Sequence, residues 1–235
     1  MGKGKSGDYF IDVLIGLHKG NGELSIDRET VKAAFQDAIG AGTGTSAGLL
    51  SWAMTELIKH PDIMKKVQDE VQGIVGERQC MTDEDYEKMD YVRAVLKETL
   101  RLHPTVPLTL RETTESFTLR GYEIPAGAFL WVNFWAIHRD PTNWDEPENF
   151  KPERFLTSSG EYQGYFPFGF GRRICPGMSF AYATTERVLA NLVHKFEWQL
   201  PNGMKPKDMD VSEKVDTMTL ERKVPLMLMA KKRFA

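Results

Sequence analysis

The chain has 235 residues, in which 30 Lys and Arg face 33 Asp and Glu to give a formal net charge of -3. The length allows one or two domains with a sizeable core, and the dispersed basic residues exclude a nucleic-acid-binding stripe, so no nucleic-acid partner is expected. No apolar run is long enough to cross a bilayer, and two cysteines, Cys80 and Cys175, exclude a disulfide framework and a multi-cysteine zinc site.

The amino-terminal segment is predicted to be a polar linker over residues 1–7. Met1 to Ser6 also satisfy the permissive N-myristoylation pattern, although a Lys- and Gly-rich linker explains these residues as well. Behind the linker, residues 9–18 have the apolar spacing of a short helix, and Gly20 ends it.

Three longer helices are predicted next. Ser25 or Asp27 can cap the first, which extends for about thirty residues to the boundary before Pro61. Apolar residues cover much of its circumference, so this helix is expected to lie between layers. Pro61 starts the second helix, which is amphipathic and closed by Gly76, and the third covers residues 90–102.

From residue 106 onward the pattern changes to short extended pieces. Gly121 and Gly127 separate them as hairpin turns, and the expected strands cover residues 117–119, 122–125 and 129–132. A meander over residues 140–164 then leads to a cysteine loop and a further helix. The tail predicts small edge strands over residues 197–200 and 224–230, because Pro225 would disrupt a central strand.

The cysteine near the carboxyl end stands in a loop rich in glycine. Gly169 and Gly171 allow backbone conformations that a Cβ would forbid, so the loop can lie flat against a large planar ligand. Behind Cys175, Pro176 suits the first position of a helix that continues over residues 178–189. The sulfur would then lie at a helix N-terminus, where amide donors and the helix dipole stabilise a metal-binding thiolate. A buried structural cysteine in a Gly/Pro turn is the alternative.

Five framework residues of this loop match a known pattern. Phe168, Gly171, Arg173, Cys175 and Gly177 fit Phe-x-x-Gly-x-Arg-x-Cys-x-Gly in order, which is the signature of the cytochrome P450 haem-thiolate monooxygenases. From about residue 8 to its end the chain resembles the carboxyl-terminal half of this family's fold. The residues of its motifs are similar to those of the plant microsomal group. The resemblance implies a mainly α fold with small β-sheets, in which residues 8–235 form the haem-binding portion of one domain.

The resemblance implies haem b (iron protoporphyrin IX) as the cofactor. Cys175 would be the iron ligand and a catalytic residue, the other signature residues would contact the haem, and Arg173 would neutralise a propionate. Arg111 matches the family position that contacts a propionate, and a solvated strand charge is its alternative. His138 is interpreted as a structural or surface residue, because a haem ligated by Cys175 needs an open distal side.

Glu98 and Arg101 stand three residues apart and therefore on one helix face. Such pairs are common on exposed helices, so the spacing alone is weak evidence for a functional role. In the resembled family, however, this pair and the arginine of a Pro-Glu-Arg-Phe segment form a buried ionic triad that braces the haem loop. The resemblance therefore implies a structural triad of Glu98, Arg101 and Arg154.

Glycines interrupt the long predicted helix near its middle. Gly40, Gly42 and Gly44 each cost about 1 kcal/mol relative to Ala, so a weak helix here suggests a purpose. The segment resembles the family's oxygen-binding bend, Ala/Gly-Gly-x-Asp/Glu-Thr-Thr/Ser. A helix kink packed against a neighbour is the alternative.

In that bend the alcohol, here Thr45, is a catalytic residue that aids proton delivery. Gly44 stands in the place of the usual acid. Proton delivery is therefore expected to be inefficient, unless Ser46, Thr43 or water substitutes.

The resemblance implies a monooxygenase, or its carboxyl-terminal half, that inserts one oxygen atom from dioxygen into a lipophilic small molecule. Electrons would come from NADPH through an NADPH-cytochrome P450 reductase, and Ala41, Val106 and Met218 would face the substrate. A haem-binding remnant without turnover and a reductase-independent rearrangement enzyme on the same scaffold are the alternatives.

The family's first half, which carries a membrane anchor, has no counterpart in the sequence. The chain is therefore expected to be a fragment or a truncated product, or else to have a pocket open on one side. A full-length parent is expected on the cytoplasmic face of the endoplasmic reticulum membrane. The chain alone, without an anchor, is expected to be soluble or prone to aggregation.

Overall fold

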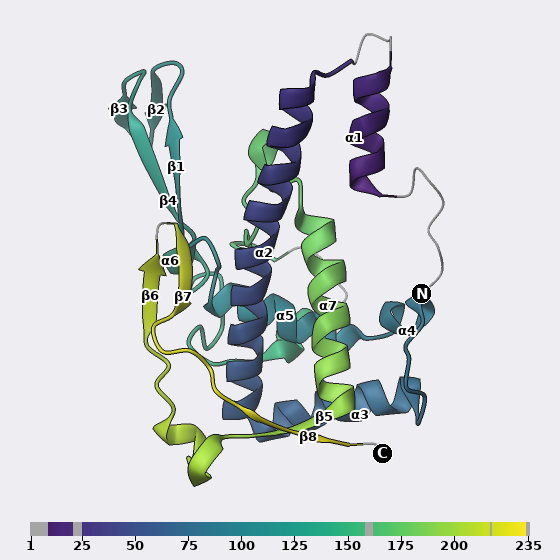
Figure 1. Ribbon diagram of the computed structural model, residues 1–235. Helices are drawn as coiled ribbons and strands as arrows, with labels where there is room; N and C mark the ends of the chain where they lie inside the picture. The colour runs from purple at the N-terminus through teal and green to yellow at the C-terminus, as the bar shows by residue number, and fades with distance from the viewer. Residues whose placement is uncertain (1–8, 21–24, 158–161, 217, 234–235) are drawn as a thin grey trace. The chain divides into compact units, whose positions relative to one another are not determined.

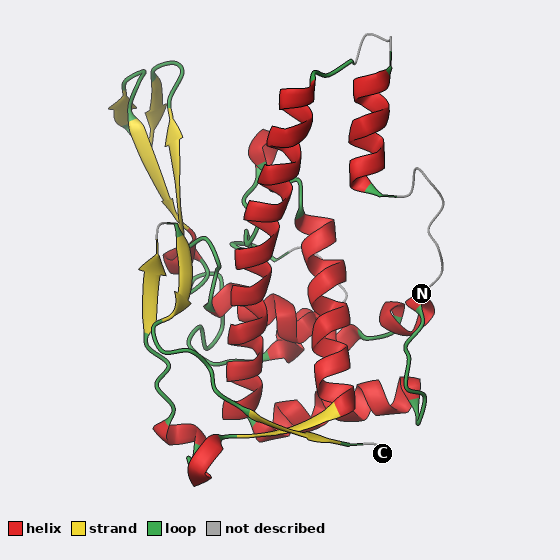
Figure 2. Ribbon diagram, in the orientation of Figure 1, coloured by secondary structure: helices red, strands yellow, loops and turns green. Residues whose placement is uncertain are grey.

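The computed structural model describes residues 9–20, 25–157, 162–216 and 218–233. Within these ranges the chain is mainly helical and carries four two-stranded antiparallel sheets (Figure 2). The predicted fold class, mainly α with small β-sheets, is confirmed. The expected linker over residues 1–7 and the myristoylation pattern lie outside the described residues.

The helices of the described residues are labelled in Figure 1. They are α1 (Phe10–Lys19), α2 (Arg28–Lys59), α3 (Pro61–Val75), α4 (Asp83–Glu87), α5 (Asp90–Leu102), α6 (Phe134–Ile137) and α7 (Met178–Lys195). Short 3₁₀ helices cover Pro152–Phe155, Gly171–Arg173, Pro201–Gly203 and Pro206–Asp208.

The strands pair antiparallel as β1 with β4, β2 with β3, β5 with β8 and β6 with β7. Their bounds are β1 (Leu108–Glu112), β2 (Phe117–Leu119), β3 (Tyr122–Ile124), β4 (Phe129–Asn133), β5 (Phe196–Gln199), β6 (Glu213–Asp216), β7 (Thr219–Arg222) and β8 (Met229–Lys232).

Two compact units make up the chain, Met1–Thr45 and Ser46–Ala235, and α2 begins in the first and ends in the second. In the first unit, His18 Nδ1 donates to the carbonyl of Ile26 at 2.9 Å, which ties the end of α1 to the segment before α2. Asp27 is the cap of α2, because Thr30 N–H donates to its Oδ1 at 2.7 Å. Helix α1 is shifted by one residue from its predicted range of 9–18, and α2 begins directly after the predicted cap Asp27 and ends at Lys59, before the predicted boundary at Pro61.

The long helix α2 runs through its glycine-rich segment without ending. Among the described residues, a Cβ at Gly40 or at Gly44 would meet no atom within 4 Å outside the nearby backbone of the helix itself. The buried residues of α2 lie between Leu49 and Leu57. The expectation that the helix lies between layers therefore holds for its carboxyl-terminal half.

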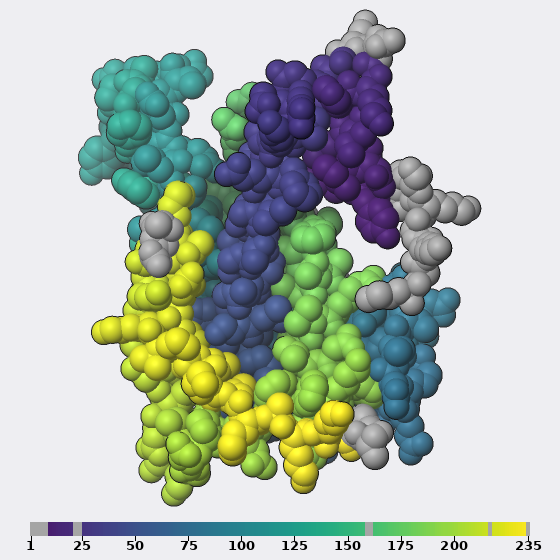
Figure 3. Space-filling view, viewed as in Figure 1, coloured from purple at the N-terminus to yellow at the C-terminus, as the bar shows by residue number. Residues whose placement is uncertain are grey.

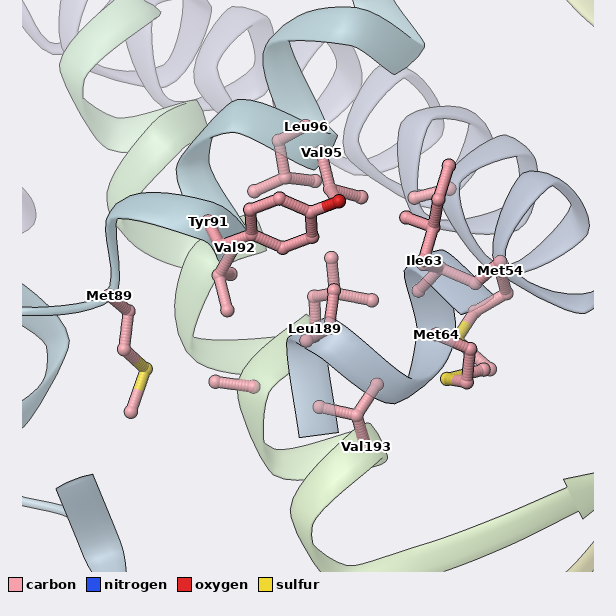
Figure 4. Packing of buried hydrophobic residues seen from close by; sticks show 14 of the residues in the cluster. Met54, Ile63, Met64, Met89, Tyr91, Val92, Val95, Leu96, Leu189 and Val193 are labelled. Atoms are coloured by element: carbon pink, nitrogen blue, oxygen red, sulfur yellow. The ribbon is translucent and has the colours of Figure 1, made fainter. Parts of the chain in front are cut away.

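The core of the second unit lies between α2, α3, α5 and α7, whose apolar side chains converge in Figure 4. The predicted apolar face of α3 is confirmed, because Met64, Val67, Val71 and Val75 are all buried. On α7, Leu189 and Val193 pack into the same cluster. Each fully buried aliphatic side chain of this kind contributes about 1.5 to 3 kcal/mol to the free energy of unfolding.

Helix α5 is fixed at its N-terminus by a side chain of α3. The Glu70 carboxylate accepts hydrogen bonds from the N–H groups of Tyr91, at 2.7 Å, and Val92, at 3.0 Å. These donors would otherwise lack partners at the start of a helix. The C-cap is His103, as the boundary before Pro104 predicts.

The strands β1 to β4 protrude from the rest of the second unit (Figures 1 and 3). Gly121 and Gly127 take φ values of 86° and 77°, the left-handed region that favours glycine in turns. Gly121 lies in the hairpin of β2 and β3 as predicted, whereas Gly127 lies between β3 and β4, which pair with other strands, so its assignment to a hairpin turn is wrong. The predicted strand bounds are met to within one residue.

The tail differs more from its prediction. The final strand is Met229–Lys232, which begins five residues and ends two residues later than expected, because Pro225 cannot donate to a sheet and the chain around it stays irregular. The pair β6 and β7 and the short helices α4 and α6 were missed, since none of them carries a long periodic pattern.

Candidate functional site

The cysteine loop is held in shape by its own backbone. Gly169 N–H donates to the carbonyl of Phe166 at 3.0 Å, and Cys175 N–H donates to the carbonyl of Phe168 at 3.0 Å. Gly169 and Gly171 have φ values of 77° and 69°, a region that residues with a Cβ rarely adopt. The loop thus needs both glycines for its conformation, and it returns the chain to Cys175 next to Phe168.

Cys175 lies three residues before the start of α7 and is exposed. Met178 N–H donates to the Cys175 carbonyl at 3.4 Å, closing a turn, and the first bond of the helix runs from Ala181 N–H to the Gly177 carbonyl at 2.8 Å. Gly177 is therefore the N-cap, and the prediction that Pro176 occupies the first helical position is wrong by two residues. The reason is the turn between Cys175 and Met178, because the helix begins only after it.

The sulfur lies beside this helix start. An ideal Cβ on Gly177 would stand 3.8 Å from Cys175 Sγ, an ordinary van der Waals distance. The dipole of an α-helix gives its N-terminus a partial positive charge, which stabilises an anion placed there. The position suits a thiolate.

Glu98 and Arg101 form a fully buried pair on α5, each with none of its side chain exposed. Arg101 Nε donates to Glu98 Oε2 and Arg101 Nη2 to Glu98 Oε1, both at 2.8 Å. The remaining Arg101 donors reach three backbone carbonyls, those of His138, Pro147 and Asn149, at 2.8, 2.7 and 3.2 Å. All five N–H groups of the guanidinium are thereby used.

Arg154 completes this cluster from the 3₁₀ helix Pro152–Phe155. Its Nε donates to Glu98 Oε1 at 3.1 Å, and Lys151 N–H donates to the same oxygen at 2.9 Å. The Arg154 side chain is 11% exposed and its other contacts are carbonyls at 3.1 to 3.5 Å. Trp144 stacks against both guanidinium groups, at 5.2 Å from Arg101 and 5.8 Å from Arg154. The structure therefore brings together the three residues of the predicted triad.

His138 connects this cluster to the cysteine loop, a link that the sequence reasoning missed. The histidine is fully buried, its carbonyl accepts from Arg101, and its Nε2 accepts from Phe166 N–H at 3.0 Å. Burial, and next the charge of Arg101, lower the pKa of His138 to about 4, so the ring is neutral at neutral pH. The interpretation of His138 as a structural residue agrees with this environment.

A second buried polar cluster, also missed, surrounds His103. Its ring nitrogens lie 3.2 Å from Glu56 Oε1 and 2.8 Å from Glu213 Oε1, and the ring stacks on Trp52 with centroids 3.9 Å apart. Burial raises the pKa of Glu56, but hydrogen bonds and charges from His103 and Lys59 lower it overall. The cluster ties α2, α5 and β6 together.

The other predicted site residues are more scattered. Arg111 is exposed on β1, where its Nη1 donates to Thr109 Oγ1 and to the carbonyl of Leu110. Val106 is half-buried, and Met218, between β6 and β7, is exposed. Leu220 N–H donates to the Thr105 carbonyl at 2.8 Å, so the segments that carry Val106 and Met218 are neighbours.

Ala41 and Thr45 belong to the first unit. The Thr45 hydroxyl donates to the carbonyl of Ala41 at 2.6 Å, and the Thr43 hydroxyl donates to that of Ile39 at 2.7 Å. Both alcohols are turned back on their own helix. Each oxygen can still accept a hydrogen bond.

The residues of the cysteine loop fit the haem that the resemblance implies. In the part of the chain that the structure describes, the Cβ positions of Gly169 and Gly171 have no atom within 4 Å beyond their chain neighbours, so a flat group can approach the backbone there. Cys175, which would supply the sulfur ligand, is exposed, and so are Arg172 and Arg173, whose cations would face propionates. Among the described residues no group of three or more His, Cys, Asp or Glu side chains could hold a metal ion. No helix within the described ranges is both long and apolar enough to span a membrane.

Comparison with known proteins gives one consistent result. The Cytochrome P450 family model matches residues 3–227. The chain is 45% identical to Cytochrome P450 71A8 of Mentha piperita over 97% of this chain and 46% of that protein. Identity is 44% to Tabersonine 6,7-epoxidase isoform 1 of Catharanthus roseus, covering 93% and 44% of the two chains. It is also 44% to Premnaspirodiene oxygenase of Hyoscyamus muticus, covering 95% and 46%.

The chain thus spans somewhat less than half the length of these relatives. The match extends across both units and includes the cysteine loop and the residues of the buried ion cluster. The chain belongs to the cytochrome P450 family.

Proposed function

We propose that this chain is the haem-binding portion of a monooxygenase that inserts one oxygen atom from dioxygen into a lipophilic small molecule. The observation that carries the proposal is the exposed Cys175 at the start of α7, in a glycine-shaped loop closed by the bond to Phe168. Relatives with matching sequence are named as an epoxidase and an oxygenase, which supports the same reaction class.

Family membership implies a haem cofactor and a redox partner. The finer assignment, haem b with electrons from NADPH through its cytochrome P450 reductase, is part of the proposal. Haem bound through the Cys175 sulfur would supply the oxygen-activating chemistry, since a thiolate ligand donates electron density that favours O–O cleavage. We also propose that the full-length enzyme works at the cytoplasmic face of the endoplasmic reticulum membrane.

The chain's own residues have separate tasks in this proposal. Cys175 would hold the iron, Arg173 and Arg111 would bind propionates, and the buried ion cluster would keep the loop in place. Thr45 delivers protons. Ala41, Val106 and Met218 contact the substrate, and the one-domain assignment of residues 8–235 belongs to the same proposal.

Labelled dioxygen tests this function. The haem-loaded protein is incubated with NADPH, reductase and either premnaspirodiene or tabersonine, the compounds named in two relatives. We expect one labelled oxygen atom in the product, only when reductase is present. Product formed equally without reductase would favour a rearrangement enzyme, and haem binding without any product from a broad panel of lipophilic compounds would favour a non-catalytic remnant.

A further inference from the structure

We propose that His138 is a positioning residue for the cysteine loop, acting through a hydrogen bond from Phe166 N–H to its Nε2. The role rests on the proposed function, because the loop matters as a haem-thiolate loop. It differs from that of the ion cluster, because His138 contacts the loop itself and Glu98, Arg101 and Arg154 do not in any hydrogen bond of the described residues.

A continuous set of hydrogen bonds leads from the ion cluster to the cysteine. Arg101 Nη1 donates to the His138 carbonyl at 2.8 Å, and the His138 ring accepts from Phe166 N–H at 3.0 Å. Two backbone bonds of the loop follow, from Gly169 N–H to the Phe166 carbonyl and from Cys175 N–H to the Phe168 carbonyl. His138 is the point at which this set enters the loop.

Two aromatic rings pack near the imidazole and restrict its orientation. The Phe134 ring from α6 lies parallel to it within 27°, with centroids 6.3 Å apart, and the Tyr165 ring lies 5.7 Å away. The Tyr165 hydroxyl donates to the Lys97 carbonyl of α5 at 3.0 Å. Because Tyr165 directly precedes Phe166, the residue that packs on the ring also fixes the donor.

The chemistry of the site favours an acceptor role for the ring. With Nε2 accepting, the proton of the neutral imidazole sits on Nδ1, which is buried and has no hydrogen-bond partner in the described residues. An unpaired buried donor is unfavourable, and a phenylalanine of similar size would avoid it. What the imidazole adds over a phenylalanine is the acceptor for Phe166 N–H.

Two variants test the role. His138→Phe keeps an aromatic ring and removes the acceptor, whereas His138→Gln carries an amide oxygen near the position of Nε2. In the haem-free chain we expect the Phe166 amide to exchange its hydrogen about tenfold faster in His138→Phe, consistent with loss of one hydrogen bond. His138→Gln should stay near the unsubstituted rate, and the Leu189 amide in the core should be unaffected in both variants.

The haem-loaded protein provides a spectroscopic reading. In His138→Phe a larger fraction of the ferrous carbonyl complex should lose the red-shifted thiolate band, and His138→Gln should retain it. Wild-type exchange and an intact band in His138→Phe would overturn the role. Equal acceleration at Phe166 and Leu189 would also overturn it, because the histidine would then serve only general stability.

A third measurement needs no variant and covers the case in which His138→Phe does not fold. Nitrogen NMR of the unsubstituted chain should find His138 neutral with its proton on Nδ1, and a proton on Nε2 would contradict the proposal. The exchange and NMR readings use no haem. If the unsubstituted protein shows no thiolate band, the proposed function fails while these two readings still decide the role of His138.

Discussion

Arg101 donates two parallel hydrogen bonds to Glu98, each 2.8 Å long, between side chains that water does not reach. A buried charge of this kind is tolerated only when it is fully paired. The carbonyls of His138, Pro147 and Asn149 occupy the remaining donors of Arg101. One helical side chain therefore holds three separate points of the segment that leads to the cysteine loop.

Arg101→Ala should lower the free energy of unfolding by about 3 to 5 kcal/mol, because Glu98 is left buried without its main partner. Arg101→Lys should recover little, since an ammonium group offers three donors and cannot match the planar fork. Arg154→Ala should cost less than Arg101→Ala, because Arg154 is partly exposed and its carbonyl contacts are long. Urea denaturation measures all three.

The matched control for the buried pair is Lys65→Ala. Lys65 and Asp69 form an ion pair on α3 whose side chains are 72% and 64% exposed. Such surface pairs contribute at most about 1 kcal/mol. Equal losses of stability in Lys65→Ala and Arg101→Ala would show that the Glu98 and Arg101 pair behaves as a surface couple.

Glu70→Ala should destabilise the chain by about 1 to 2 kcal/mol, since the N–H groups of Tyr91 and Val92 at the start of α5 lose their acceptor. The neighbouring substitution Asp69→Ala removes a carboxylate from the same helix without touching α5. Thermal or urea unfolding of both variants decides the point. A Glu70→Ala variant no less stable than Asp69→Ala would contradict the capping role.

The lowered pKa of His138 should make the free energy of unfolding depend on pH, with a sign that follows from the direction of the shift. Its pKa is lowered from 6.5 to about 4 in the folded chain by burial first and then by the positive charges of Arg101 and Arg139, and Tyr165 packs near the ring. Between these values the unfolded chain binds more protons, so the free energy of unfolding should fall as the pH decreases from about 6.5 to about 4. The loss should amount to about 3 kcal/mol.

The His138→Gln variant isolates this contribution. Both proteins contain the same carboxyl groups, so the difference between their stability curves reports the histidine. We expect the variant's unfolding free energy to change less over this pH range. Parallel curves would mean that the His138 ring titrates normally in the folded chain.

Elements whose ends are set by neighbouring residues were predicted well from the sequence, and elements that depend on distant contacts were not. The ends of α3 and α5 were predicted to the residue, because Pro61, Gly76 and Pro104 act on the backbone beside them. The β6 and β7 pair was missed, since its four-residue strands carry no clear alternation. Short strands depend on contacts that no local window contains.

The residues of the site likewise divide into those that are close together in the sequence and those that are distant. The pattern around Cys175 is contiguous, so its residues could be named from the sequence. The bond between Glu98 and Arg154 spans 56 positions and was expected only from the family resemblance. The bond between His138 and Phe166 spans 28 positions. No spacing rule connects these two residues, so His138 could be placed only by the structure.

Gly44→Asp should raise the yield of product per NADPH consumed. A carboxyl group at this position would supply a proton source that glycine cannot. General acid catalysis typically raises the rate of a proton-transfer step about a hundredfold or more. Of the described residues, only the nearby backbone of the helix itself lies within 4 Å of the added Cβ, so the helix has room for the substitution. In the unsubstituted protein, much of the NADPH consumed should yield peroxide in place of product.

Gly40→Asp is the control for Gly44→Asp, because its Cβ position on the same helix is equally open. Product, peroxide and NADPH are measured together in a reductase assay. Tight coupling in the unsubstituted protein, unchanged or lowered by Gly44→Asp, would show that protons arrive by another path.

The ferrous carbonyl spectrum of cysteine variants tests the central claim most directly, because the structure offers two exposed thiols, Cys175 and Cys80, and the account assigns the iron to one of them. Cys80→Ser should keep the red-shifted thiolate band at full intensity, and Cys175→Ser should abolish it. A band that survives in Cys175→Ser and disappears in Cys80→Ser would contradict the assignment of Cys175 as the haem ligand.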